Sequence, residues 1–252
     1  MAASPSHCRR LDGLRVHLAA GVTLPTYMDA MRPALRCKEY AVSAGHYLAA
    51  TAAHNILAAG GNAVDAGVAG GLVLGVVMPE FVHVGGVAPI ILRLADGTVV
   101  TLPGLGRWPE LATLETCKAT WGPDCTSVPT GIGRQIVPGA PAAWIRALEL
   151  YGTKSWSEVA ATAVSCAEGI IVYPILAHNL APGGYGAEAY KQGEETARVM
   201  KPDGRAPELG EMFIQENLAK TLKVRENHVD GGVSSVFLLC PEPVLANDCL
   251  FK

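Results

Sequence analysis

The sequence lacks the short signatures that mark the commonest nucleotide, ester and metal sites. Gly-x-Gly-x-x-Gly is not present, and the Gly-x-Gly pairs at residues 104–106 and 131–133 lack the third glycine of a dinucleotide-binding loop. There is no Gly-Lys-Ser/Thr phosphate loop, no Gly-x-Ser-x-Gly elbow and no His-Glu-x-x-His motif. These absences exclude the best-known local motifs, and we expect no cofactor.

Paired metal-binding cysteines are also missing. The seven cysteines include no Cys-x-x-Cys pair, which argues against a zinc site and against a dense disulfide framework. His46 and His54 lie about two helical turns apart, and we interpret them as ordinary polar or core histidines rather than metal ligands. We expect no metal. We also expect a reducing compartment, in which most of the seven cysteines are free thiols; they are Cys8, Cys37, Cys117, Cys125, Cys166, Cys240 and Cys249.

Export and membrane signals are absent as well. Asp12, Arg15 and His17 interrupt the apolar run that a secretory signal would need. No Asn-x-Ser/Thr glycosylation acceptor occurs. The longest apolar stretch, residues 66–79, is shorter than the roughly 20 residues of a membrane span and is rich in glycine. We therefore expect a cytoplasmic protein with no membrane partner.

Charges and aromatic residues are few. Only 17% of the residues are charged, the net charge is -3 and the isoelectric point is near 6.2, so no nucleic-acid partner is expected. Half of the 252 residues are hydrophobic and the mean hydropathy is +0.25, which favours a large buried core. With aromatics at 6%, that core must consist mainly of aliphatic and alanine side chains.

What the chain does contain is a helix, a glycine stop and an immediate second helix within residues 44–79. Apolar residues repeat every four positions up to about Ala59, and Gly60 and Gly61 suit the backbone that ends a helix. Asn62 is a predicted N-cap, and Asp65 an acidic residue in the next first turn. The second helix contains four glycines, Gly67, Gly70, Gly71 and Gly75. Together they lower the stability of the helix by roughly 3 kcal/mol relative to alanine, so we expect another backbone to pack close to them.

The rest of the chain is predicted to combine a hairpin, loops and further helices. Residues 90–94 and 99–102 form the hairpin, because Asp96-Gly97 is a favoured pair for a two-residue turn. Their nearly continuous apolar character indicates a sheet covered on both faces. A strand is predicted to start at 40–42, residues 183–210 to be irregular, and helices to lie at about 110–120, 139–151, 155–169, from 174, and at 215–226.

Residues 60–66, Gly-Gly-Asn-Ala-Val-Asp-Ala, resemble the hallmark of the gamma-glutamyltransferase (gamma-glutamyltranspeptidase) family near the start of its large subunit. Three later blocks are similar to that family and follow in the same order, at residues 137–153, 163–169 and 215–222. The likeness covers about residues 40–226. We accordingly divide the chain into a poorly ordered N-terminal arm at 1–35, a large-subunit domain at 36–228, and an atypical tail at 229–252.

The resemblance implies an α+β fold, the large-subunit part of an N-terminal-nucleophile hydrolase with an αββα sandwich. In such enzymes a threonine at the start of the small subunit is the nucleophile, and its own α-amine is the base. This sequence contains no Thr-Thr-His or Thr-Ser-His. We therefore expect the nucleophilic threonine on a small-subunit partner segment, and an inactive isolated chain.

The resemblance also implies one substrate-binding residue. The family's large subunit pairs an arginine with the substrate carboxylate, four residues before a proline; here Leu105 occupies that spacing from Pro109, and Arg107 lies two residues before the proline. Arg107 is our candidate for that role, with a solvated surface arginine as the alternative. The glycine loop at residues 85–89 also departs from the family pattern, and His83 beside it is a candidate pocket residue.

Two functions remain open at this point. The first is a subunit of an amidohydrolase or acyltransferase acting on small amides that bear a carboxylate, either γ-glutamyl amides of the glutathione type or oxamate-like amides. Oxamate amidohydrolases and cephalosporin acylases are relatives to consider. The second is a catalytically dead paralogue that serves as an interaction or regulatory protein.

Overall fold

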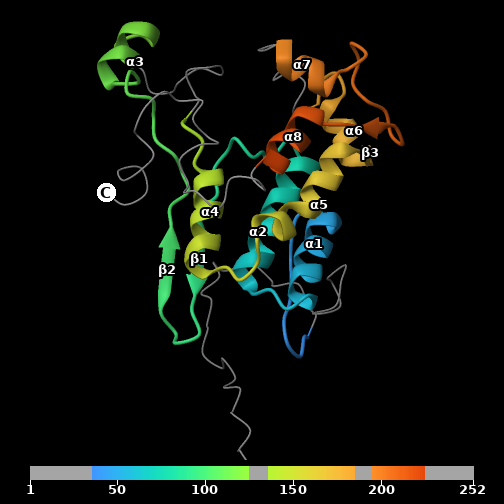
Figure 1. Cartoon of the computed structure of the whole chain (residues 1–252). Helices are drawn as coiled ribbons and strands as arrows, with labels where there is room; N and C mark the ends of the chain where they lie inside the picture. The colour runs from blue at the N-terminus through green and yellow to red at the C-terminus, as the bar shows by residue number, and fades with distance from the viewer. Residues whose placement is uncertain (1–35, 125–135, 185–193, 225–252) are drawn as a thin grey trace, which may run out of the picture. The chain divides into compact units, whose positions relative to one another are not determined.

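The computed structural model describes residues 36–124, 136–184 and 194–224 (Figure 1). The chain divides into two units, residues 1–40 and 41–252, and every helix and strand given below belongs to the second. These elements are α1 (Tyr47–Ala58), α2 (Ala63–Val77), β1 (Ile90–Arg93), β2 (Val99–Leu102), α3 (Leu114–Trp121), α4 (Ala140–Tyr151), α5 (Trp156–Glu168), β3 (Ile170–Ile171), α6 (Pro174–Leu180), α7 (Glu194–Met200), β4 (Met212–Phe213) and α8 (Glu216–Val224).

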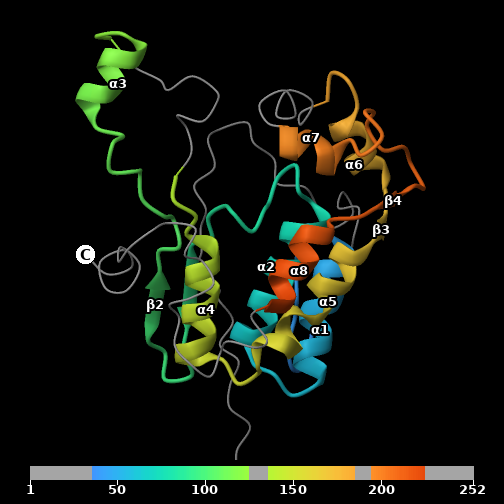
Figure 2. The ribbon, with the colours of Figure 1, turned by 45° about the horizontal axis from the view of Figure 1, so that its top comes forward.

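Helix α2 is at the centre of the core. It packs against α1, α4 and α5, and α5 in turn packs against α8 (Figure 2). Leu72, Val73 and Val76 of α2 have no exposed surface, and the facing residues are largely alanines of α1, α4 and α5. The predicted core of aliphatic and alanine side chains is therefore confirmed for the described residues.

The helix boundary at residues 59–63 follows the local sequence signals. Gly60 has φ +81°, and the Asn62 side chain accepts hydrogen bonds from the amides of Val64 and Asp65. The Asp65 carboxylate in turn accepts a hydrogen bond from the Asn62 amide at 2.8 Å, and these reciprocal bonds form a capping box. The predicted glycine stop and N-cap are both present.

The glycines of α2 have several different neighbours. A β-carbon on Gly70 would lie 3.5 Å from the Ala49 carbonyl oxygen, so the expected close backbone is present there. At Gly75 the neighbour is the Val84 backbone at 3.3 Å, whereas Gly71 lies against the Trp144 indole. Among the described residues Gly67 has no neighbour within 4 Å, so the expected close backbone is present at Gly70 and Gly75 but not at Gly67 or Gly71.

The sheets are small and antiparallel, which confirms the α+β class. Strand β1 pairs with β2, with Ile90 opposite Leu102 and Arg93 opposite Val99. The connection is a three-residue loop rather than the predicted two-residue turn, because the Leu94 amide bonds to the Thr98 carbonyl and Gly97 has φ +91°. The second sheet pairs β3 with β4.

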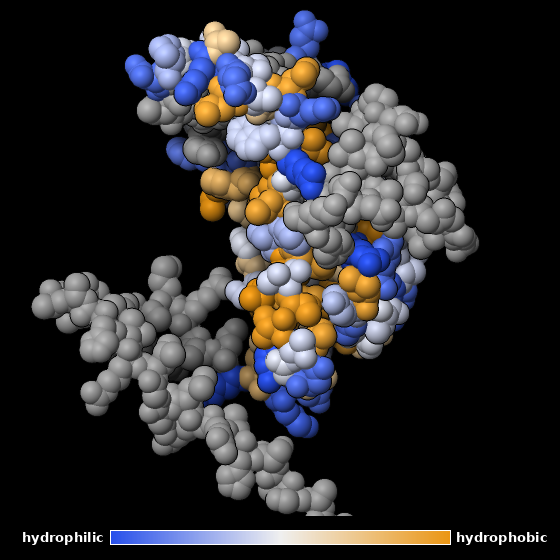
Figure 3. All heavy atoms as spheres, turned by 90° about the vertical axis from the view of Figure 1, so that its left-hand side faces the viewer, coloured by the Kyte–Doolittle hydropathy of each residue, from blue (hydrophilic) through white to orange (hydrophobic). Residues whose placement is uncertain are grey.

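The hairpin is covered on one face within the described residues. Leu102 is buried, but Ile91 and Val99 on the opposite face are 72% and 58% exposed. Figure 3 shows apolar side chains reaching the surface on this side of the molecule. The expected two-sided cover was therefore wrong for this part of the chain: successive strand residues point to opposite faces, so both faces are apolar, but only the face with Leu102 is packed.

Other predictions had mixed outcomes. The helices expected at 139–151, 155–169, from 174 and at 215–226 correspond to α4, α5, α6 and α8. No strand occurs at 40–42, and the supposedly irregular region 183–210 contains α7. The predicted arm at 1–35 and tail at 229–252 lie outside the described residues, and the domain boundaries remain predictions. No helix in the described ranges is long and apolar enough to cross a membrane.

Candidate functional site

Three stretches of backbone, residues 83–89, 104–109 and 136–140, meet at the start of α4. We call them the glycine junction. The Gly86 carbonyl oxygen accepts hydrogen bonds from the amides of Gly139 and Ala140, both at 3.1 Å. The Ala88 amide donates to the Gly104 carbonyl at 2.9 Å. These bonds connect each stretch to the next, so the junction is held by main-chain contacts.

Glycine is required where the stretches cross. A β-carbon on Gly104 would lie 2.1 Å from the Ala88 carbonyl oxygen, and one on Gly106 would lie 1.8 Å from the Val137 carbonyl oxygen. Gly104 and Gly106 also have φ of +54° and +76°, in the left-handed region that side chains disfavour. The two glycines therefore set both the conformation and the close approach of the loop that carries Arg107.

Arg107 is held by its backbone and exposed at its side chain. Its carbonyl oxygen accepts a hydrogen bond from the Val137 amide at 2.8 Å, immediately after Gly106. Its neighbours Leu105 and Trp108 are 53% and 52% exposed. The structure thus places the candidate arginine on a constrained loop beside two exposed apolar side chains.

His83 belongs to the same junction. Its carbonyl oxygen accepts a hydrogen bond from the Gly86 amide at 2.9 Å, and its ring lies over the loop, 3.5 Å from where a β-carbon on Gly86 would be. Its side chain is exposed. Among residues 83–89, 104–109 and 136–140 the ionisable side chains are His83 and Arg107, so the junction carries positive charge without any acidic residue.

The other histidines singled out from the sequence do not join this site. His46 is buried, and its Nδ1 accepts a hydrogen bond from the Leu48 amide at the start of α1. Burial lowers the pKa of His46. His54 is exposed on the same helix. Across the described ranges no group of three or more histidine, cysteine, aspartate and glutamate side chains is arranged to hold a metal ion.

The start of α2 connects to the loop after α4 through Asp65. This carboxylate has no exposed surface and accepts from the Thr153 amide at 2.9 Å, the Thr153 hydroxyl at 2.7 Å and the Lys154 amide at 3.2 Å. Asn62 donates to the Tyr151 carbonyl at 2.6 Å. Burial alone raises the pKa of Asp65, but hydrogen bonds from Asn62, Thr153 and Lys154 lower it below its usual value. Sequence reasoning identified Asp65 as a first-turn residue and missed this contact.

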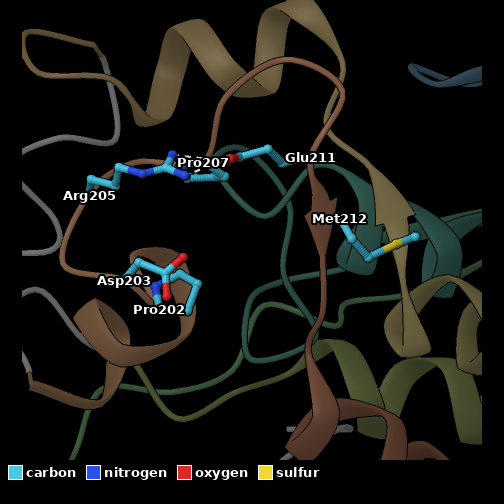
Figure 4. A pocket seen from close by; sticks show the side chains of 6 residues that line it. All are labelled: Pro202, Asp203, Arg205, Pro207, Glu211 and Met212. Atoms are coloured by element: carbon cyan, nitrogen blue, oxygen red, sulfur yellow. Dashed lines mark hydrogen bonds and ion pairs between the residues drawn. The ribbon is translucent and has the colours of Figure 1, made fainter.

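A separate pocket of about 300 Å³ lies between α7 and β4 (Figure 4), lined by Pro202, Asp203, Arg205, Pro207, Glu211 and Met212. Arg205 donates to both carboxylate oxygens of Glu211, at 3.0 and 2.5 Å. Hydrogen bonds from Arg205 and from the Glu208 amide lower the pKa of Glu211 to about 2. The two charges neutralise each other, so we interpret this pair as holding the loop together rather than binding a ligand.

Comparisons with known proteins agree with the resemblance in the sequence. The family model described as Gamma-glutamyltranspeptidase matches residues 49–229. The chain is 31% identical over 205 residues to the glutathione hydrolase proenzyme of Escherichia coli K12, covering 80% of this chain and 35% of that protein. It is 34% identical over 197 residues to the acylase ACY 1 proenzyme of Pseudomonas sp. SE83, covering 73% of this chain and 34% of that protein.

A solved structure is similar as well. Helicobacter pylori gamma-glutamyltranspeptidase superposes with a TM-score of 0.67 at 28% identity, covering 77% of this chain and 56% of that chain. The chain spans about a third of the length of the two curated relatives. None of these comparisons tests Arg107, which stays a candidate from the sequence.

Proposed function

Because this chain belongs to the gamma-glutamyltranspeptidase family and corresponds to its large-subunit region, we propose that it is part of an amidohydrolase or acyltransferase. Its substrates are small amides that bear a carboxylate, of the γ-glutamyl or the oxamate-like kind. The chain supplies the scaffold and one wall of the site. A small-subunit segment supplies the nucleophilic threonine.

The observation that carries the substrate part of this proposal is the position of Arg107. Its backbone is held by the Val137 amide and by two glycines that tolerate no β-carbon, while its side chain is exposed. A guanidinium on a rigid backbone is suited to a bidentate contact with a carboxylate, because its planar fork loses little freedom on binding. Arg107 therefore orients the substrate and takes no part in bond breaking.

The chemistry then proceeds by acyl transfer. The threonine hydroxyl, deprotonated by its own α-amine, attacks the amide carbonyl and forms an ester as the amine leaves with the proton. Water or an acceptor amine next attacks that ester, releasing the acyl product and restoring the threonine. Backbone amides hold the oxyanion of each tetrahedral intermediate.

The test is to produce the chain alone and together with the polypeptide encoded after or beside it, and to measure amine release from γ-glutamyl, glutaryl and oxamate amides. We expect activity only from the combination, and a Thr-Thr-His or Thr-Ser-His triplet in the added segment. Arg107→Ala should lower kcat/KM by roughly tenfold to a hundredfold, the cost of a lost charged hydrogen bond. Hydrolysis by the isolated chain would overturn the assignment of the nucleophile to another segment.

A second candidate is a catalytically dead paralogue that serves as an interaction or regulatory protein. The observation in its favour is Leu105, which stands at the spacing where the family places its arginine. If no nucleophile-bearing segment is encoded with the chain and no combination is active, this second function replaces the first. In either case we propose a cytoplasmic location, which fluorescence microscopy of a tagged chain would test.

A further inference from the structure

The ribbon formed by β3 and β4 carries an apolar face that is largely exposed. Ile171 and Met212 lie opposite each other in the ladder, and they are 57% and 56% exposed. Ile214, two residues after Met212, is 53% exposed. The opposite face of the ribbon is packed, since Ile170 and Phe213 are buried. Both faces of this ribbon are therefore apolar, and only one of them belongs to the core.

The exposed side chains form one continuous surface, and we call Ile171, Met212 and Ile214 the ribbon face. A β-carbon on Gly169 would lie 2.8 Å from the Met212 sulfur and 3.8 Å from Ile214, so these two side chains lie together over the glycine. Met212 also lines the pocket between α7 and β4 (Figure 4). The solvated face of an antiparallel ribbon is normally polar, so a contiguous apolar face indicates that another segment packs on it.

The ribbon face lies within reach of the chain that follows α8. Lys223 in the last turn of α8 forms an ion pair with Glu168, which ends α5 just before β3. Residues 225–232 can span up to about 26 Å when extended, almost twice the length of α8, which is about 14 Å. The chain beyond residue 232 can therefore return to the ribbon.

The sequence at that point suits an apolar face. Residues 225–232 are mostly polar and end in two glycines, whereas residues 233–239, Val-Ser-Ser-Val-Phe-Leu-Leu, contain five apolar side chains and no charge. The family match ends at residue 229, so this segment lies outside it. A tethered segment acts at an effective concentration of roughly millimolar, an advantage that a separate partner lacks.

We propose that residues 233–239 pack on the ribbon face, with Phe237 against Met212. Packing removes apolar surface from water on both the segment and the face, which is the driving force for the contact. The inference does not depend on the function proposed above, because it concerns a surface and a segment of this chain and no catalytic group.

The test follows the methyl group of Met212 by NMR in the full chain, with isotope-labelled methionine methyl groups and Met212→Leu to assign the signal. A soluble nitroxide broadens the signal of a methyl group that solvent reaches. We expect Met212 to be protected in the wild type and broadened in Phe237→Ser, because the burial of one phenylalanine shifts such an equilibrium by at least about tenfold. The matched control Phe251→Ser changes the same residue type outside the segment and should leave Met212 protected.

A second variant, the chain shortened to residues 1–229, should expose Met212 as Phe237→Ser does. The signal of Met78, which packs against the core, should stay unchanged in both variants and shows that the fold is intact.

The other outcomes overturn the inference. Equal broadening of Met212 in the wild type and in Phe237→Ser would show that the segment does not cover the face. Protection that persists in Phe237→Ser and in the shortened chain would assign the cover to something else. Protection that weakens on dilution would identify a second copy of the chain, and protection that appears only with the nucleophile-bearing segment would identify that partner.

Discussion

The Asp65 carboxylate accepts hydrogen bonds from both the backbone amide and the hydroxyl of Thr153, which is 88 residues further along the chain. The same carboxylate closes the capping box of α2. One buried side chain therefore accepts the hydrogen bond of the N-cap amide at the start of the central helix and also holds the loop between α4 and α5 against this helix. Since α4 begins at the glycine junction, this contact helps to position the site through the scaffold.

Removing this contact should destabilise the fold. Asp65→Ala leaves the part-buried amides of Asn62, Thr153 and Lys154 without this acceptor, and we expect it to lower the free energy of unfolding by about 3 kcal/mol. Thr153→Val removes only the hydroxyl bond and should cost about 1 kcal/mol. Urea unfolding followed by circular dichroism measures both. As a control, Thr221→Val removes an exposed hydroxyl that bonds within its own helix, and should change the stability by less than about 0.5 kcal/mol.

The same carboxylate should make stability depend on pH in the acid range. Its folded-state pKa is lowered, so its contribution is present above the pKa of the unfolded chain, near 4, and is lost as the pH falls further. We expect the wild-type urea midpoint to fall more steeply below about pH 4 than that of Asp65→Asn. Parallel curves for the two proteins would show that Asp65 is not the group responsible.

Local signals were enough to predict the helix boundaries. Gly60, Asn62 and the Ser155–Glu158 capping box all act within a few residues, and each is present as expected. The likeness to solved structures also confirms the large-subunit part of an N-terminal-nucleophile hydrolase fold. Recognition of that fold depended on the family resemblance of residues 60–66 and the later blocks.

Contacts between distant residues were not predictable in this way. Strand β4 has two residues and exists because it pairs with β3, some 40 residues earlier, so it has no periodicity of its own. The Asp65–Thr153 contact has no local signature either. Arg107 was named from the sequence, but the crossing of its loop with residues 83–89 and 136–140 required the structure, because main-chain hydrogen bonds do not depend on side-chain type.

A hydrogen bond at the end of α2 should make the stability of the fold depend on pH in the alkaline range. The Tyr173 hydroxyl donates to the Val77 carbonyl at 2.9 Å, and burial, assisted by the negative charge of Glu80, raises the pKa of Tyr173. A raised folded-state pKa contributes stability below the unfolded value of about 10, and that contribution is lost as the pH rises beyond it. Wild-type stability should therefore fall more steeply above about pH 10 than that of Tyr173→Phe.

The matched control for this prediction is Tyr47→Phe, because Tyr47 is 71% exposed. Its pH profile should follow the wild type, because Tyr47→Phe leaves the Tyr173 phenol and its bond to the Val77 carbonyl in place. Unfolding midpoints between pH 9 and 11 would be measured for the three proteins. If Tyr173→Phe loses stability as steeply as the wild type, the phenol is not the group that titrates.

The glycine junction can be tested with two glycines of nearly equal backbone conformation. Gly106 has φ +76° and Gly204 has φ +74°. A β-carbon at Gly106 would be 1.8 Å from the Val137 oxygen, whereas one at Gly204 would meet no described residue within 4 Å. Gly204→Ala should cost only the left-handed penalty, about 1 kcal/mol. Gly106→Ala should cost at least about 2 kcal/mol more, because the loop must also move away from residue 137.

The effect of Gly106→Ala on the kinetic constants distinguishes a role of Gly106 in positioning Arg107 from a merely structural role. In the enzyme combined with its nucleophile-bearing segment, displacement of the loop moves Arg107, so Gly106→Ala should raise KM for a carboxylate-bearing amide substrate more than it lowers kcat. Gly204→Ala should leave both constants unchanged. Equal stabilities for the two variants, or an unchanged KM in a folded Gly106→Ala enzyme, would show that the crossing of residues 106 and 137 does not position the arginine.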